Sequence, residues 1–73
     1  MSKHATLEPE GQIANAMISG RNEKGMTQKN LAYVAGTSLS HISRLENGNA
    51  NPTIIFLKRI AAGLEKELHI EFR

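Results

Sequence analysis

Two short helical patterns joined without a linker, residues 27–46 (TQKNLAYVAGTSLSHISRLE), constrain this fold more than any other feature. Gly36 separates them and can turn the backbone with a positive φ, which other residues rarely adopt. Ala32 is small enough for the two helices to approach closely, and Ile42 supplies an apolar side chain that packs back into the corner. Together with Gln28, this spacing predicts a helix-turn-helix whose second helix is exposed on the surface. Further core contacts are expected from Leu31, Ala35 and Leu45.

Helices are also predicted on both sides of this corner. Pro9 suits the first turn of a helix, where its acidic neighbours favour the positive helix end. This helix should stop at Gly25, since glycine readily adopts the left-handed conformation found at helix ends. N-caps for the three later helices are expected at Thr27, Ser38 and Thr53. The apolar faces of the first and fourth helices are predicted at Ile13, Ala14, Met17, Ile18, Ile54, Leu57, Ile60, Ala61 and Leu64.

The pattern changes after the fourth helix. Leu68, Ile70 and Phe72 alternate with polar residues, which is the two-residue period of a β-strand. A single strand cannot satisfy its own backbone groups, and no other segment predicts a strand, so the same strand of a second copy is the expected partner. The alternative is a fifth helix that covers the core of one monomer. The predicted fold is therefore an all-α bundle of four to five helices with a short C-terminal β-strand.

With 73 residues, the chain is expected to form one small domain. Its predicted parts are a flexible arm at residues 1–9, the helix-turn-helix domain at residues 10–66 and a dimerisation strand at residues 67–73. The lack of cysteine excludes disulfides and thiolate metal sites, and the three scattered histidines do not suggest a metal cluster, so no cofactor is expected. No apolar run resembles a membrane span or signal peptide. We therefore expect a cytoplasmic protein without a membrane partner.

The charges are unevenly distributed along the chain. Residues 20–60 carry six basic and two acidic side chains, whereas the two flanks together carry three basic and five acidic ones. Solvated surface charge explains such a pattern by itself, but the amide-rich loop NGNANP in the same region favours a polyanionic partner. The sequence suggests no nucleophile–base pair, glycine-rich phosphate loop or convergent carboxylates, so an enzyme is not expected.

Residues 25–64, GMTQKNLAYVAGTSLSHISRLENGNANPTIIFLKRIAAGL, resemble the helix-turn-helix domains of the Cro/C1 or Xre family. The resemblance is carried by TQ at the start of the second helix, LA within it, AGTS at the turn, ISRLENG at the end of the third helix and IAAGL at the end of the fourth. It implies a phage-repressor-like bundle and a sequence-specific DNA-binding transcriptional regulator, which usually acts as a repressor. Such a protein binds an inverted-repeat operator as a homodimer through the third helix.

The alternating tail resembles that of antitoxin-type members of the same family. This second resemblance implies a different function, in which the protein neutralises a toxin protein and also autoregulates its operon. A third hypothesis is a helical interaction module that has lost DNA binding, but the basic middle of the chain argues against it.

The resemblance also assigns DNA-binding residues by position. Base contacts are expected from Ser38, Leu39, Ser40 and Arg44. Arg44 is the strongest candidate, because its planar guanidinium can donate to both O6 and N7 of guanine. Leu39 either packs on a thymine methyl group or is partly buried. Phosphate contacts are expected from Thr27, Gln28, Lys29, His41, Ser43, Asn47, Asn49 and Asn51, although the three asparagines could instead only shape the turn.

Two further expectations concern charged residues outside the DNA contacts. By resemblance, Arg21 at the end of the first helix forms a structural ion pair with Glu46. Breaking this pair would leave one charge stranded at the edge of the core. Lys58 and Arg59 are expected to face solvent.

Overall fold

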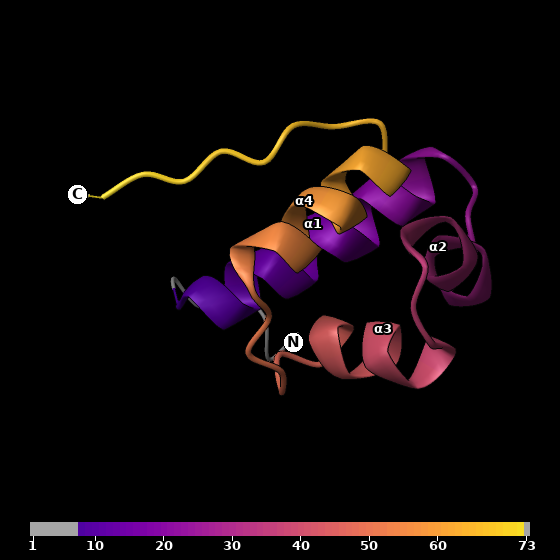
Figure 1. Ribbon diagram of the computed structural model, residues 1–73, viewed down its shortest axis with the longest axis horizontal. Helices are drawn as coiled ribbons and strands as arrows, with labels where there is room; N and C mark the ends of the chain where they lie inside the picture. The colour runs from indigo at the N-terminus through magenta and orange to yellow at the C-terminus, as the bar shows by residue number, and fades with distance from the viewer. Residues whose placement is uncertain (1–7, 73) are drawn as a thin grey trace.

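The computed structural model describes residues 8–72, which form four α-helices (Figure 1). The helices are α1 (Pro9–Glu23), α2 (Gln28–Ala35), α3 (Leu39–Glu46) and α4 (Ile54–Gly63). α2 packs against both α3 and α4, and α3 also packs against α1. Of the arm predicted at residues 1–9, residues 1–7 lie outside the described part, and Pro9 is already the first residue of α1. None of the described helices is long and apolar enough to cross a membrane.

The local sequence sets the helix boundaries as predicted. The hydroxyl groups of Thr27, Ser38 and Thr53 accept hydrogen bonds from the backbone N–H three residues later, at 3.0, 3.1 and 3.0 Å. At the start of α2, the Asn30 side chain also accepts from the Thr27 N–H at 3.1 Å, which completes a capping box. Gly36 ends α2 with a φ of 70°. These caps and this turn are confirmed.

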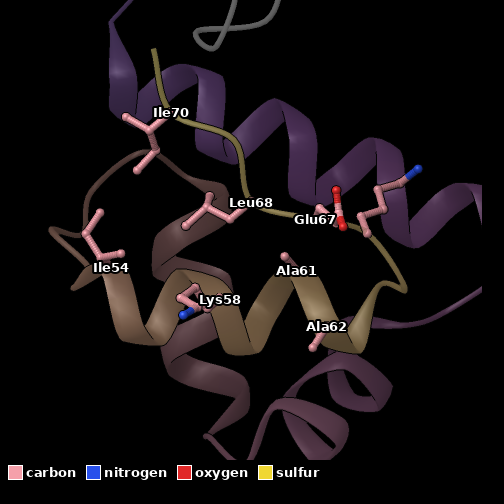
Figure 2. Close-up of a pocket in the computed structure, with 8 residues that line it drawn as sticks. Ile54, Lys58, Ala61, Ala62, Glu67, Leu68 and Ile70 are labelled. Atoms are coloured by element: carbon pink, nitrogen blue, oxygen red, sulfur yellow. The ribbon is translucent and has the colours of Figure 1, made fainter. Parts of the chain in front are cut away.

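The segment after α4 differs from the prediction. The chain turns at Glu65, which has a φ of 57°, and residues 66–72 then run as an extended tail that forms neither a strand nor a fifth helix (Figures 1 and 2). Both expectations for residues 67–73 are therefore wrong for the single chain as far as it is described. The physical reason is that a strand needs a second edge, and the described residues contain no other strand. Leu68 is half-buried, while Ile70 and Phe72 remain 53% and 97% exposed.

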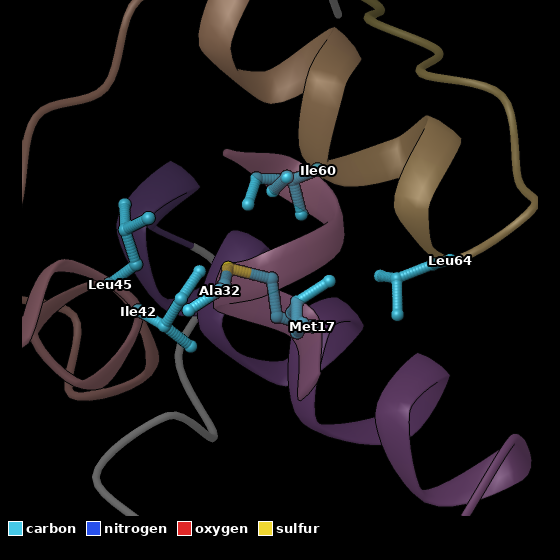
Figure 3. Packing of buried hydrophobic residues seen from close by; sticks show 8 residues of the cluster. Met17, Ala32, Ile42, Leu45, Ile60 and Leu64 are labelled. Atoms are coloured by element: carbon cyan, nitrogen blue, oxygen red, sulfur yellow. The ribbon is translucent and has the colours of Figure 1, made fainter. Parts of the chain in front are cut away.

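The core fills the space between the four helices (Figure 3). Ala32 is 4% exposed and Ile42 is fully buried, which confirms the tight α2–α3 corner. Burying such side chains stabilises the fold by about 25 cal/mol per Å² of apolar surface. Ile54 is 52% exposed, so its predicted place on the core face is wrong. It is the first residue of α4 and lies beyond the edge of the core, where it faces the tail. The buried apolar residues are Ala14, Met17, Leu31, Ala32, Ala35, Ile42, Leu45, Leu57, Ile60 and Leu64.

Candidate nucleic-acid interface

A buried carboxylate holds the C-terminal end of α3. Glu46 is 4% exposed, and its two oxygens accept hydrogen bonds from Arg21, at 2.6 Å from Nε and 2.8 Å from Nη2. Arg21 also donates through Nη1 to the Met26 carbonyl at 2.9 Å. The hydrogen bond with Glu46 raises the pKa of Arg21 above its ordinary value, so the guanidinium stays charged. The structure thus contains the expected ion pair, which joins α1, the loop before α2 and α3.

Gln28 belongs to the same network. Its Nε2 donates to Glu46 Oε1 at 3.0 Å, so Glu46 accepts three side-chain hydrogen bonds in all. The resemblance assigns this glutamine to a phosphate, whereas the structure directs its amide group towards the end of α3. Gln28 therefore positions the N-terminus of α2 against α3.

The opposite side of α3 is exposed and polar. Ser40 and Arg44 are four residues apart, so they lie one above the other on the same helix face, and both are exposed. Leu39 is 48% exposed at the start of the helix, which leaves about half of its surface open to a ligand. Ser38 is exposed as well, and its hydroxyl caps the helix at the His41 N–H. The four expected base-contact residues are thus gathered on the outer side and N-terminal end of one helix.

The N-terminal half of α3 is held by His41. Its Nδ1 lies 3.0 Å from Thr37 Oγ1, and its ring stacks on Phe56 of α4 with 4.5 Å between centroids and 14° between planes. His41 is half-buried as a result. A residue expected at a phosphate therefore also fixes α3 against α4.

Arg59 does more than face solvent, which corrects the expectation for this residue. Its Nη2 donates to the carbonyls of Ala35 and Gly36, at 2.7 and 2.9 Å, and so satisfies the C-terminal end of α2. Its guanidinium also lies 5.5 Å from the centroid of the Phe56 ring. The sequence carries no signal for this contact, because 24 residues separate Arg59 from Ala35.

The remaining phosphate candidates lie at the start of α2, within α3 and on the loop after α3. The loop after α3 is closed by backbone hydrogen bonds, from Gly48 N to Leu45 O and from Asn49 N to Arg44 O, both at 3.1 Å. Within the described residues, the side chains of its asparagines make no hydrogen bond, so the backbone shapes this turn. The exposed candidates are Thr27, Lys29, Asn47, Asn49 and Asn51, whereas Ser43 is half-buried.

The free positive charge lies on α2, α3 and α4. Lys24 pairs with Glu65 at 2.6 Å, and Arg21 is neutralised by Glu46. In the part of the chain from residue 8 to residue 72, four basic side chains form no salt bridge: Lys29, Arg44, Lys58 and Arg59. Two of these four side chains, Lys29 and Arg44, belong to the helix-turn-helix.

Comparison with known proteins agrees with this geometry. The family model described as helix-turn-helix (HTH_3) matches residues 18–70. This chain belongs to the Cro/C1-type helix-turn-helix family. Among relatives, the chain is 43% identical to the transcriptional regulator SlrR of Bacillus subtilis over 49 residues. These aligned residues cover 66% of this chain and 32% of SlrR. It is 40% identical to SinR of the same organism over 50 residues, and these residues cover 67% of this chain and 45% of SinR. This helix-turn-helix chain thus spans less than half of either regulator.

Two solved structures resemble this helix-turn-helix chain over most of its length. One is the restriction-modification controller protein C.Esp1396I, solved as a tetramer in complex with its natural 35 base-pair operator. It has a TM-score of 0.73 and 38% identity, over 77% of this chain and 74% of the controller. The other is a toxin-antitoxin module from Streptococcus pneumoniae, with a TM-score of 0.66 and 32% identity, over 100% of this chain and 83% of that one.

Proposed function

We propose that this protein is a sequence-specific transcriptional regulator that represses by binding an inverted-repeat operator as a homodimer. The observation that carries the proposal is the outer face of α3, where Ser40 and Arg44 are exposed while both ends of the helix are held in place. Such a helix fits the major groove of DNA. The controller protein solved with its operator shares 38% identity with this chain, which supports the same use of the fold.

In this proposal the residues divide by role. Arg44 reads guanine with two hydrogen bonds, Ser40 and Ser38 contact neighbouring base edges, and Leu39 packs on a thymine methyl group. The exposed groups at the start of α2 and on the loop after α3 bind phosphates and supply most of the salt-dependent affinity. Gln28 and His41 contact phosphates while Gln28 is held by its hydrogen bond to Glu46 and His41 by its stack on Phe56. The phosphate set is Thr27, Gln28, Lys29, His41, Ser43, Asn47, Asn49 and Asn51.

The dimer is proposed to form through the tails. Leu68, Ile70 and Phe72 alternate with polar residues, and Ile70 and Phe72 stay exposed in the single chain. Pairing two tails would give each the second edge that a strand requires. Two copies of α3 would then meet successive half-sites about 10 base pairs apart, or a multiple of that distance.

Selection of bound duplexes from a random DNA pool tests this function. At about 150 mM salt, purely electrostatic binding is reduced, and we expect enrichment of a motif with two-fold symmetry. Arg44→Ala should weaken binding to that motif by about 5- to 150-fold and relax the preference at one position of each half-site. The matched control is Lys58→Ala, which removes the same charge from α4 and should keep the selected motif. A pool without enrichment would refute sequence-specific binding.

A second candidate function is that of an antitoxin. The observation that favours it is the match to the toxin-antitoxin module, which extends over 100% of this chain and so includes the tail. The expected partner is a toxin protein encoded beside this chain. Co-expression with the product of the adjacent reading frame should restore growth and yield a stable complex. If the product of the adjacent reading frame still arrests growth although this protein is present and folded, the two are not a toxin and its antitoxin.

A further inference from the structure

His41 lies at the edge between the exposed and the buried side of α3. It is half-buried, and it precedes the exposed Arg44 by three residues, so the two side chains are neighbours on the helix. Its ring stacks on Phe56 with 4.5 Å between the centroids. This stack fixes the plane of the ring, but the plane alone does not determine which ring nitrogen carries the proton.

The two ring nitrogens of His41 have different surroundings. Nδ1 lies 3.0 Å from the hydroxyl oxygen of Thr37, whereas Nε2 has no hydrogen-bond partner within the described residues. In the same part of the chain, no buried side-chain nitrogen or oxygen lacks a partner, so Nε2 reaches the surface. The structure therefore holds one nitrogen inside and presents the other to solvent.

We infer that Thr37 sets the tautomer of His41 and so makes its Nε2–H a donor for a DNA phosphate. This inference rests on the proposed function, in which His41 contacts a phosphate. The oxygens of a DNA phosphate only accept hydrogen bonds, so the contact requires a proton on Nε2. In a neutral imidazole Nδ1 is then an acceptor, and the hydroxyl of Thr37 lies within reach as its donor.

The opposite tautomer does not suit this site. With its proton on Nδ1, His41 would donate to the Thr37 oxygen, and Nε2 would face the phosphate with a lone pair. Two acceptors repel each other, so the ring would then oppose the contact. The Thr37 hydroxyl would also lose its acceptor, since no other group between residues 8 and 72 accepts a hydrogen bond from it.

The backbone around Thr37 is held in place, as a positioning residue requires. Its N–H donates to the Ala32 carbonyl at 2.9 Å, and the preceding carbonyl, that of Gly36, accepts from Arg59 Nη2 at 2.9 Å. The hydroxyl therefore belongs to a turn that both α2 and α4 fix. The imidazole is thus held through its ring face and one nitrogen before any DNA is present.

Nitrogen-15 NMR of the histidine rings tests the tautomer in the free protein. At about pH 8, where an imidazole is ordinarily neutral, we expect His41 to carry its proton on Nε2 alone. Thr37→Ser keeps the hydroxyl and should keep this state, whereas Thr37→Val, which has nearly the same shape, should give a mixture of tautomers. A proton on Nδ1 of His41, or an unchanged ring state in Thr37→Val, would overturn the inference.

Affinity for DNA tests the phosphate contact. The probe is a duplex that carries the motif obtained by selection from the random pool. Thr37→Val should weaken binding by about 2- to 10-fold, the range of one ordinary hydrogen bond, and Thr37→Ser should bind as tightly as the unmodified chain.

A double-mutant cycle separates this role from a merely structural one. His41→Phe keeps a ring that can stack on Phe56 but lacks both nitrogens. In that background Thr37→Val should weaken binding no further, because no tautomer remains to be set. An equal and additive loss in both backgrounds would make Thr37 a structural residue only and overturn the inference.

The outcomes also distinguish the inference from the function on which it rests. Sequence-specific binding that is unchanged in Thr37→Val refutes the role of Thr37 but leaves the proposed regulator intact. A protein that binds no duplex at about 150 mM salt refutes the proposed function and the phosphate contact with it. Circular dichroism shows whether each variant is folded, and the ring state of the unmodified chain tests the inference even if Thr37→Val does not fold.

Discussion

Replacing Glu46 with alanine should destabilise this protein more than most single substitutions. The change removes the acceptor of three hydrogen bonds and leaves Arg21, whose side chain is 14% exposed, without a counter-charge. Removing one partner of a buried ion pair costs about 3–5 kcal/mol. Arg21 keeps its bond to the Met26 carbonyl and some contact with water, so we expect the lower value, about 3 kcal/mol. A domain of this size has a total stability of roughly 4–11 kcal/mol, so the variant should be only marginally folded.

Urea unfolding followed by circular dichroism at 222 nm measures this loss. The matched control is Glu23→Gln, which breaks the exposed Lys66–Glu23 pair, whose side chains are 48% and 58% exposed, and should cost less than about 1 kcal/mol. A double variant, Arg21→Met with Glu46→Leu, removes both charges and should be more stable than Glu46→Ala. A cost below about 1 kcal/mol for Glu46→Ala, or a double variant as unstable as the summed single changes, would refute the buried-charge argument.

Three further predictions concern the turns and the tail. In urea unfolding, Gly36→Ala should cost about 2 kcal/mol and Gly25→Ala about 1 kcal/mol. Both glycines have a positive φ, but only a Cβ at Gly36 would clash with Arg59, 2.7 Å from Nη2. Equal losses in the two variants would exclude a role for this clash. Arg59→Met should lower the Tm by about 4–8 °C through loss of its bonds to the end of α2, and an unchanged Tm would contradict that cap. The hydrogen bond from Lys24 lowers the pKa of Glu65 from its ordinary 4.5, so this pair stabilises the fold above that pH and loses its effect as the pH falls through the folded-state pKa. NMR titration should show a higher Glu65 pKa in Lys24→Met, and the same pKa in both proteins would disprove the contact.

Local chemistry explains why the helix boundaries could be predicted from the sequence. A cap such as Thr27 or Ser38 acts on a backbone group three residues away, and Gly36 needs only its own missing side chain to adopt a φ of 70°. The small residue Ala32 and the apolar Ile42 follow from helical periodicity. Within the candidate interface, the same periodicity separates the buried side of α3 from its exposed side.

Contacts between distant segments explain what the sequence did not reveal. The amide of Gln28 lies on Glu46, and Arg59 caps α2 across 24 residues. The ring of His41 stacks on Phe56 of α4, and no residue pattern announces that contact. The tail is a different case, because the alternation at Ile70 predicted a strand, whereas the described residues contain no second strand edge with which the tail could pair.

The double attachment of α3 bears on the entropy of binding. An isolated helix of eight residues is unstable in water, yet α3 is held by the His41–Phe56 stack near one end and by Glu46 at the other. A helix that is already ordered loses little conformational freedom when a ligand docks on it. Binding through α3 should therefore show a small heat-capacity change, and differences in affinity between ligands should arise from the contacts themselves and not from a cost of folding.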